Sequence, residues 1–276
     1  MRNAKQGVFI LIAVVMIVAS VGLIAMKKGY GDGTSNREKD GTRVFTGTVE
    51  KLVLEAGACD IEVITGDTDD YILAYKGLSY GTLSDSLKDG VLTITHKYDA
   101  GWPARMFSGN GIKDTKISLT IPEDAELAQA VFEFGAADVE MESVTAKELV
   151  IKVGAGELNA HKLAATEKAL FTVGAGVFSA EDVDLFNATL ECGVGEMEVS
   201  GNITGENTVD CGVGETTLTL TGDEESYHGN LNCGLGEINM GSAKISGSGT
   251  KSYGTSSAES RMDIKCGIGE VDVRFH

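Results

Sequence analysis

LECGVGEMEV at residues 190–199 and VDCGVGETTL at residues 209–218 are two copies of the ten-residue pattern that decides how this chain folds. Five more copies are FEFGAADVEM (132–141), IKVGAGELNA (151–160), FTVGAGVFSA (171–180), LNCGLGEINM (231–240) and IKCGIGEVDV (264–273). The first glycines of successive copies lie 19, 20, 19, 19, 22 and 33 residues apart, and a degenerate eighth copy is LEAGACDIEV at 54–63. Self-similarity at a nearly fixed period indicates that each copy is one unit of a repeat architecture.

Apolar residues recur at five positions of the pattern: three and one before the first glycine, and one, four and six after it. Within a copy they alternate with polar residues, which is the period of a strand with one buried face. Because the same positions stay apolar from copy to copy, each copy is expected to stack on the last, with like side chains ~4.8 Å apart. The pattern predicts an all-β fold, a parallel β-helix or flattened β-roll solenoid of about 19–20 residues per turn. The alternative is an antiparallel sandwich, which would not keep this register.

The glycines of each G-x-G mark a sharp corner between strands, because glycine accepts positive φ and lets backbones approach closely. We expect residues 126–276 to form the β-solenoid repeats. Residues 44–125 are expected to form a less regular N-terminal β region that contains the degenerate copy. The last turn ends at Val271, Val273 and Phe275 with only His276 behind it. It is therefore predicted to present an unpaired sheet end.

The N-terminal segment has the features of a membrane anchor. Nineteen residues from Val8 to Met26 carry no charge. A helix of that length spans roughly 28 Å, close to the thickness of a bilayer's hydrocarbon core, and the run is longer than the apolar part of a cleaved secretory signal. We predict a short tail at 1–6, a transmembrane helix (signal anchor) at 7–26 and a flexible linker at 27–43. The protein would then cross the membrane once, through residues 7–26.

The charge balance excludes one class of partner. Beyond residue 30 the chain has 19 basic and 41 acidic residues, a net charge of −22. A surface this negative repels phosphate backbones, so we expect no nucleic-acid binding.

One column of the repeat is acidic. It lies three residues after the first glycine and contains Asp138, Glu157, Glu196, Glu215, Glu237 and Glu270. Carboxylates ~5 Å apart in water repel by roughly 0.8 kcal/mol per pair, so solvent, backbone N–H groups or a cation must offset the repulsion. Carboxylate oxygens are ligands that Ca²⁺ accepts. Two interpretations stay open, a solvated acidic ridge and a ladder of calcium sites; calcium is the only cofactor considered.

The cysteines follow the repeat as well. Four of the five, Cys192, Cys211, Cys233 and Cys266, stand one residue before the first glycine, where Val153 and Val173 stand in other copies. They are expected to be buried as small apolar side chains. Side chains in register on parallel strands point the same way, which suits neither a disulfide nor a tetrahedral zinc site. An odd number of thiols is unusual outside the cytosol.

The recurring G-x-G-[D/E] pattern, the lead-in LTIPEDAEL at 119–127 and the upstream anchor together resemble a bacterial "putative adhesin" family of unknown function, over about residues 44–276. The resemblance implies a β-strand-repeat solenoid on the cell envelope, with no established enzymatic role or cofactor. Lysines and arginines flank the anchor almost equally, so the distribution of positive charge does not decide its orientation. The resemblance favours an extracellular position for the C-terminal domain.

Three functions compete at this point. The first is a membrane-anchored, extracytoplasmic, non-catalytic binding protein whose partner is an envelope polymer or another envelope protein. The second is a cytoplasmic, membrane-attached scaffold that polymerises end to end and resembles bactofilins. The third is a carbohydrate-active β-helix enzyme such as a lyase, which needs a basic residue; the repeats offer only Arg261 and Arg274 as arginines. No catalytic motif is found, so we expect a protein that is not an enzyme.

Overall fold

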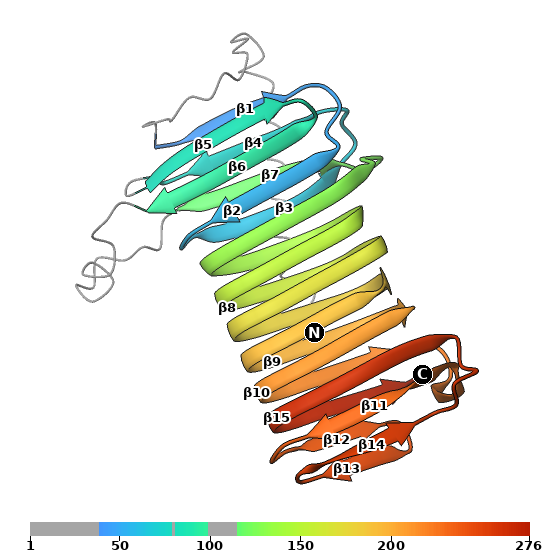
Figure 1. Cartoon of the computed structure of the whole chain (residues 1–276). Helices are drawn as coiled ribbons and strands as arrows, with labels where there is room; N and C mark the ends of the chain where they lie inside the picture. The colour runs from blue at the N-terminus through green and yellow to red at the C-terminus, as the bar shows by residue number, and fades with distance from the viewer. Residues whose placement is uncertain (1–38, 79–80, 99–114) are drawn as a thin grey trace, which may run out of the picture.

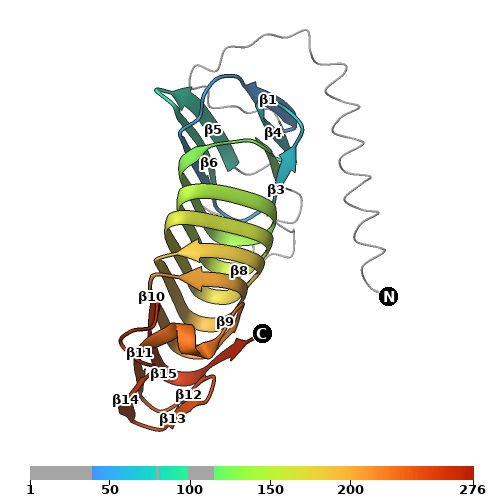
Figure 2. The same ribbon diagram turned by 90° about the vertical axis from the view of Figure 1, so that its right-hand side faces the viewer.

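The computed structural model describes residues 39–78, 81–98 and 115–276, and these form an elongated all-β solenoid (Figures 1 and 2). The predicted tail at 1–6, the transmembrane helix at 7–26 and most of the linker at 27–43 lie outside the described residues. Within the described ranges, no helix is both long and apolar enough to cross a bilayer.

Four long strands wind around the body of the solenoid. They are β8 (Leu127–Phe186), β9 (Ala188–Thr204), β10 (Glu206–Leu220) and β15 (Ser260–Phe275). They pair in parallel and in the register of the repeat: Gly195 lies beside Gly176 on one side and Gly214 on the other. The two views show the turns as flat coils stacked along one axis (Figures 1 and 2). The predicted stacking of like residues is confirmed for these turns.

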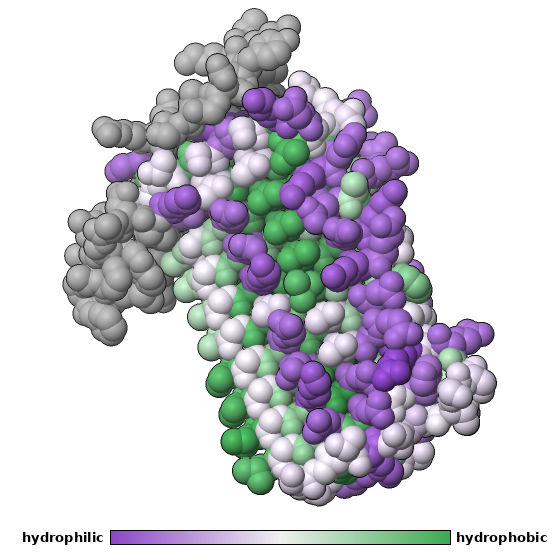
Figure 3. Space-filling model, viewed as in Figure 1, coloured by the Kyte–Doolittle hydropathy of each residue, from purple (hydrophilic) through white to green (hydrophobic). Residues whose placement is uncertain are grey.

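The interior is filled by four of the five apolar columns. The positions three and one before the first glycine, and four and six after it, are buried in every one of the seven copies. Phe132, Phe171 and Phe178 are among the largest fully buried side chains. Burying a side chain of this size contributes roughly 1.5–3 kcal/mol. The fifth column, directly after the first glycine, is an exception. Its residues are exposed in the C-terminal turns and form a line of apolar atoms along one edge (Figure 3).

The turns do not follow chain order at the C-terminal end. Strand β15 pairs with β10 on one side and with β11 (Tyr227–Cys233) and β12 (Glu237–Met240) on the other. The last copy of the repeat therefore lies between the two copies that precede it, and strict sequential stacking was a wrong prediction here. The longer connections allow this, since the last two first glycines are 33 residues apart and not 19. A short 3-10 helix, Glu224–Ser226, starts the detour.

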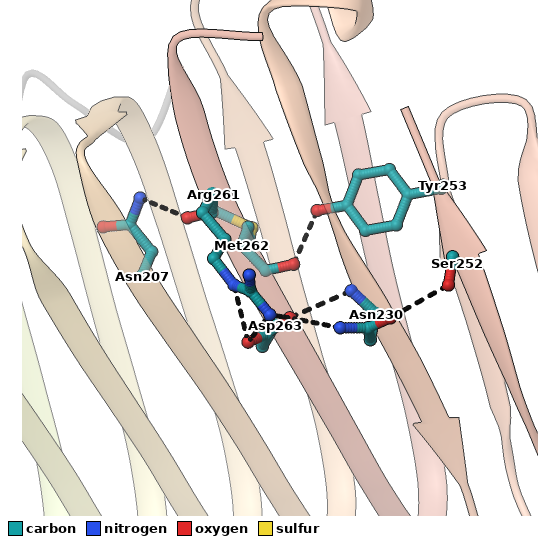
Figure 4. Close-up of polar contacts among 7 residues, drawn as sticks. All are labelled: Asn207, Asn230, Ser252, Tyr253, Arg261, Met262 and Asp263. Atoms are coloured by element: carbon teal, nitrogen blue, oxygen red, sulfur yellow. Dashed lines mark hydrogen bonds and ion pairs between the residues drawn. The ribbon is translucent and has the colours of Figure 1, made fainter. Parts of the chain in front are cut away.

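Side chains from both neighbours hold β15 in place (Figure 4). The side-chain amide of Asn207, on β10, donates to the carbonyl oxygen of Arg261 at 3.1 Å. The hydroxyl of Tyr253 donates to the carbonyl oxygen of Met262 at 2.6 Å. From β11, the side-chain amide of Asn230 donates to the Asp263 carboxylate at 3.2 Å. The inserted strand is thus fixed by polar contacts as well as by its parallel ladders.

Antiparallel strands close this end. Strand β13 (Ala243–Ser246) pairs with β12, and β14 (Gly249–Tyr253) pairs with β11. The unpaired sheet end predicted at Val271, Val273 and Phe275 is wrong for Val271 and Val273, which pair with β10 on one side and β12 on the other, whereas Phe275 pairs with Leu220 of β10. Because β15 is inserted between two earlier turns, the last copy of the repeat is not the terminal layer of the solenoid.

The N-terminal end is built in a similar way. Its strands are β1 (Gly41–Phe45), β2 (Lys51–Ala56), β3 (Asp60–Gly66), β4 (Tyr71–Lys76), β5 (Gly81–Lys88), β6 (Val91–Tyr98) and β7 (Lys116–Pro122). The degenerate copy, β2 and β3, lies between the first turn of β8 and a further layer made of β6 and β7. Strands β4 and β5 then pair antiparallel with that layer. A buried ion pair between Arg43 and Asp85 joins β1 to β5, with the Arg43 guanidinium over the Tyr75 ring.

Candidate binding surface

The G-x-G corners form one continuous edge of the solenoid, and only glycine fits there. Gly195 and Gly214 have φ of +149° and +154°, a region that other residues rarely adopt. A Cβ added at either would lie 2.0 Å from the carbonyl oxygen of the glycine one turn before it. The backbones of successive turns therefore touch directly along this edge. The residue between the two glycines points away from the core.

The acidic column runs beside this edge, as the repeat predicted. Glu215 lies beside Glu196 on one side and Glu270 on the other, and Glu237 follows Glu270. Asp60 lies beside Asp138 in the N-terminal turns. Val177 interrupts the column beside Glu196 and divides it into two blocks. The structure thus brings the six predicted carboxylates into one line, with Asp60 as a further member.

Neighbouring polar side chains offset part of the repulsion. The side-chain amide of Asn239 donates to Glu237 at 3.1 Å and to Glu270 at 3.4 Å. Lys244 also contacts Glu237, and the hydrogen bonds from Lys244 and Asn239 hold the pKa of that carboxyl below its ordinary value. In the N-terminal block, Asn159 donates to Glu157 at 3.1 Å. These contacts support the solvated-ridge interpretation.

The carboxylates lie along a line and do not surround a point. No group of three or more His, Cys, Asp or Glu side chains among the described residues is arranged to hold a metal ion. Near the N-terminal block there is a hollow of about 400 Å³ whose lining includes Asp60, Lys116, Asp138 and Glu157. Calcium binding by the ladder stays a prediction; it would be tested by comparing melting curves in millimolar calcium and in chelator.

An apolar ridge borders the C-terminal block of the acidic column. It is defined by the residues between the two glycines in four adjacent turns. In spatial order these are Val194, Val213, Ile268 and Leu235, with exposed fractions of 56%, 47%, 56% and 77%. Figure 3 shows a row of apolar surface along the lower left margin of the solenoid. Ala155 and Ala175 hold the same position in the earlier turns, so the ridge belongs to the C-terminal half.

Sequence reasoning placed this column with the core, and that was wrong. Alternation puts the residue after Gly193 on the same face as Cys192, which is buried. The corner breaks the alternation, because the extra bend at the glycines turns Val194 outward. The signal was nevertheless present in the sequence as a change from alanine to larger apolar residues inside G-x-G.

The four column cysteines are buried, as predicted. Cys192, Cys211, Cys266 and Cys233 lie beneath the apolar ridge in the same four turns, and all are free thiols. The arginines considered for catalysis are both paired with aspartates on their own strand. Arg261 contacts Asp263 at 2.9 Å and Arg274 contacts Asp272 at 2.5 Å. These ion pairs give no support to a role for either arginine as a catalytic base.

Several solved structures are similar to this chain. A "putative cell adhesion protein" from Clostridium sporogenes is 16% identical, covering 86% of this chain and 100% of its own, with a TM-score of 0.37. A "putative lipid binding protein" from Parabacteroides distasonis is 17% identical, covering 85% and 97%, with a TM-score of 0.40. A "putative adhesin" from Bacteroides fragilis is 14% identical, covering 86% and 97%, with a TM-score of 0.36.

No curated protein matches the chain. A family of known sequence pattern does match, over residues 49–267, which include the degenerate copy, six complete repeats and the inserted turn as far as Gly267. That match covers most of the chain. The protein belongs to the Toastrack DUF4097 family.

Proposed function

We propose that this protein is a membrane-anchored, extracytoplasmic, non-catalytic binding protein of the bacterial cell envelope. Its apolar ridge is the contact surface, and its partner is another envelope protein. Two of the similar solved structures are titled a putative cell adhesion protein and a putative adhesin, and a third a putative lipid binding protein; all three titles describe binding and none an enzyme. The uncharged run at 7–26 supports the anchor.

The ridge is the observation that carries this proposal. Four large apolar side chains in line, on a rigid sheet edge, are costly to leave in water unless they are covered by a partner. Glu196, Glu215 and their two neighbours in the column run parallel to the ridge a few residues away. A partner segment with apolar residues next to basic ones would match both rows. Charge complementarity of this kind also accelerates association.

The binding surface can be tested with a defined probe. The full chain in nanodiscs would be titrated with a fluorescent peptide of alternating valine and lysine, and binding measured by anisotropy. A peptide of alternating valine and glutamate is the matched control. We expect the basic peptide to bind, with affinity falling as salt rises. Binding of both peptides alike would contradict a role for the acidic column.

Variants distinguish specific binding at the apolar ridge from non-specific hydrophobic binding. The double variant Ile268→Asp and Leu235→Asp removes the centre and the end of the ridge, and should weaken binding about tenfold or more. Val44→Asp is the matched control, because Val44 is an exposed apolar residue on β1 at the opposite end. Equal loss in both variants would refute the ridge as the contact surface. Binding to isolated peptidoglycan that survives the ridge variant would instead indicate an envelope polymer as the partner.

Orientation needs its own test. The described native cysteines are buried, so a reporter can be introduced at exposed Ser256, in the loop between β14 and β15. A membrane-impermeant maleimide should label Ser256→Cys in intact cells. It should label Asn3→Cys, in the predicted tail, only after permeabilisation. The reverse pattern would favour a cytoplasmic protein, in which the edge strands offered for end-to-end polymerisation would be β13 and β14 and not β15.

A further inference from the structure

The four cysteines of the C-terminal turns form a column of neighbouring thiols. Cys211 lies directly beside Cys192 and Cys266, and Cys266 lies beside Cys233. All four are buried free thiols. The column is continuous only because β15 places Cys266 between Cys211 and Cys233. Cys59, the remaining cysteine, lies near the other end of the solenoid, in the degenerate copy.

The spacing of the column suits one coordination geometry. Side chains in register on parallel strands point the same way, so neighbouring sulfurs repeat at about the strand separation of ~4.8 Å. A disulfide needs Cβ atoms about 3.8 Å apart, which is closer than this register provides. A tetrahedral zinc site needs four ligands around one point, and the described residues hold no such cluster. Two metal–thiolate bonds of about 2.3 Å each, placed end to end, span about 4.6 Å. The column therefore matches an ion that takes two sulfur ligands in a line.

The thiols lie inside an apolar core. The Cys211 thiol donates a weak hydrogen bond to the carbonyl oxygen of Glu270 at 3.9 Å. The sulfurs are therefore the soft ligand atoms that this part of the core offers to an ion.

The Gly236 corner lies directly over one of the thiols. The Cys266 sulfur lies 2.9 Å from the position that a Cβ at Gly236 would take, so no side chain can stand over it at that corner.

We propose that this column binds thiophilic d10 cations, Cu(I) or Ag(I), each held in line by the sulfurs of two adjacent turns. Soft thiolate ligands select Cu(I), zinc and iron–sulfur clusters, and the in-line spacing of two sulfurs favours Cu(I) over the tetrahedral zinc site. Each monovalent ion replaces the thiol protons of its two ligands, the two protons pass to solvent, and no electron is transferred, so that each loaded site carries a net charge of −1. This site is separate from the ridge, and the two proposals stand or fall independently.

The test uses the full chain, reduced and kept free of oxygen in detergent. It is titrated with Ag(I), and with Cu(I) in competition with bicinchoninate. Four thiols taken two at a time should bind about two ions per chain. X-ray absorption of the loaded protein should show two sulfur neighbours per ion. Failure to compete with the chelator, or three or more sulfur neighbours, would overturn the proposal.

Valine variants locate the site. Valine occupies this column at Val153 and Val173, so the double variant Cys192→Val and Cys211→Val should fold, which circular dichroism checks. It should lose half of the bound ions, whereas Cys59→Val should keep them all. Unchanged binding in the double variant, or loss in Cys59→Val, would refute the assignment. If the double variant does not fold, the sulfur count in the native protein decides.

Discussion

The corner glycines offer the sharpest test of why the turns stack as they do. Replacing Gly214 by alanine has two separate consequences. The φ of +154° is a conformation that costs a residue with a Cβ about 1–3 kcal/mol. The new Cβ would also lie 2.0 Å from the Gly195 carbonyl oxygen, where ordinary contact begins at 3.4 Å. Because that oxygen belongs to the backbone of the next turn, the clash is relieved only by separating the two turns at the corner.

Separation breaks parallel pairing at Gly214 and leaves buried backbone groups without partners, at about 1–3 kcal/mol for each. We therefore expect Gly214→Ala to lower the free energy of unfolding by about 4 kcal/mol in total. Gly222→Ala is the control, since Gly222 has a φ of +111° but nothing within 4 Å of the added Cβ. It should cost about 1–3 kcal/mol.

Urea unfolding followed by circular dichroism measures both free energies. If Gly214→Ala is no more destabilising than Gly222→Ala, then backbone contact between turns does not define the edge.

Two further predictions test the ends of the solenoid. Burial lowers the pKa of His96 to about 4, so below pH 6.5 the unfolded chain binds a proton there that the folded chain does not. Stability should therefore fall by about 3 kcal/mol between pH 6.5 and pH 4, and His96→Leu should abolish that part of the pH dependence; identical pH profiles would exclude His96 as the cause. At the other end, Asn207 accepts a hydrogen bond from the Ala188 N–H at 2.8 Å and donates to β15. Asn207→Ala should cost about 3 kcal/mol, whereas Asn202→Ala, which removes only a solvent-exposed hydrogen bond to Asp184, should cost at most about 1 kcal/mol; equal losses of unfolding free energy in the two variants would contradict the locking role.

The repeat register was predictable from sequence because every copy places its glycines and apolar residues at the same positions of the pattern. Cys192 and Cys211 align as letters and lie side by side as residues. The insertion of β15 was not predictable in the same way. Any copy of the repeat can pair with any other. The pattern therefore determines the register in which Cys266 aligns with its neighbours, but it does not determine which turns those neighbours belong to. Only the 33-residue spacing before Gly267 hinted at a detour.

The antiparallel closures had no repeat signal at all. Strands β13 and β14 pair through backbone groups, and their side chains do not follow the columns. Of the candidate surface, the acidic column was predictable from the sequence and the apolar ridge was not. The acidic column follows from residue type, since Glu215 and its neighbours point to solvent wherever the strand runs straight. The ridge was misplaced because alternation, which decides which face is buried, fails at a positive-φ glycine.

The ridge and the inserted turn are connected by geometry. Val213 and Leu235 are not neighbours; Ile268 lies between them and makes the line continuous. A partner that covers the ridge would therefore contact strands β10, β15 and β12 together, across segments distant in the sequence. Such a surface exists only after β15 has closed the solenoid. Binding at the ridge would favour the inserted state over any form in which the last turn is detached, because a ligand stabilises the state that presents its whole site. The same logic ties the partner to the integrity of the fold: Asn207→Ala, which loosens β15 without touching the ridge, should weaken peptide binding at temperatures where the strand begins to detach and leave it unchanged below them.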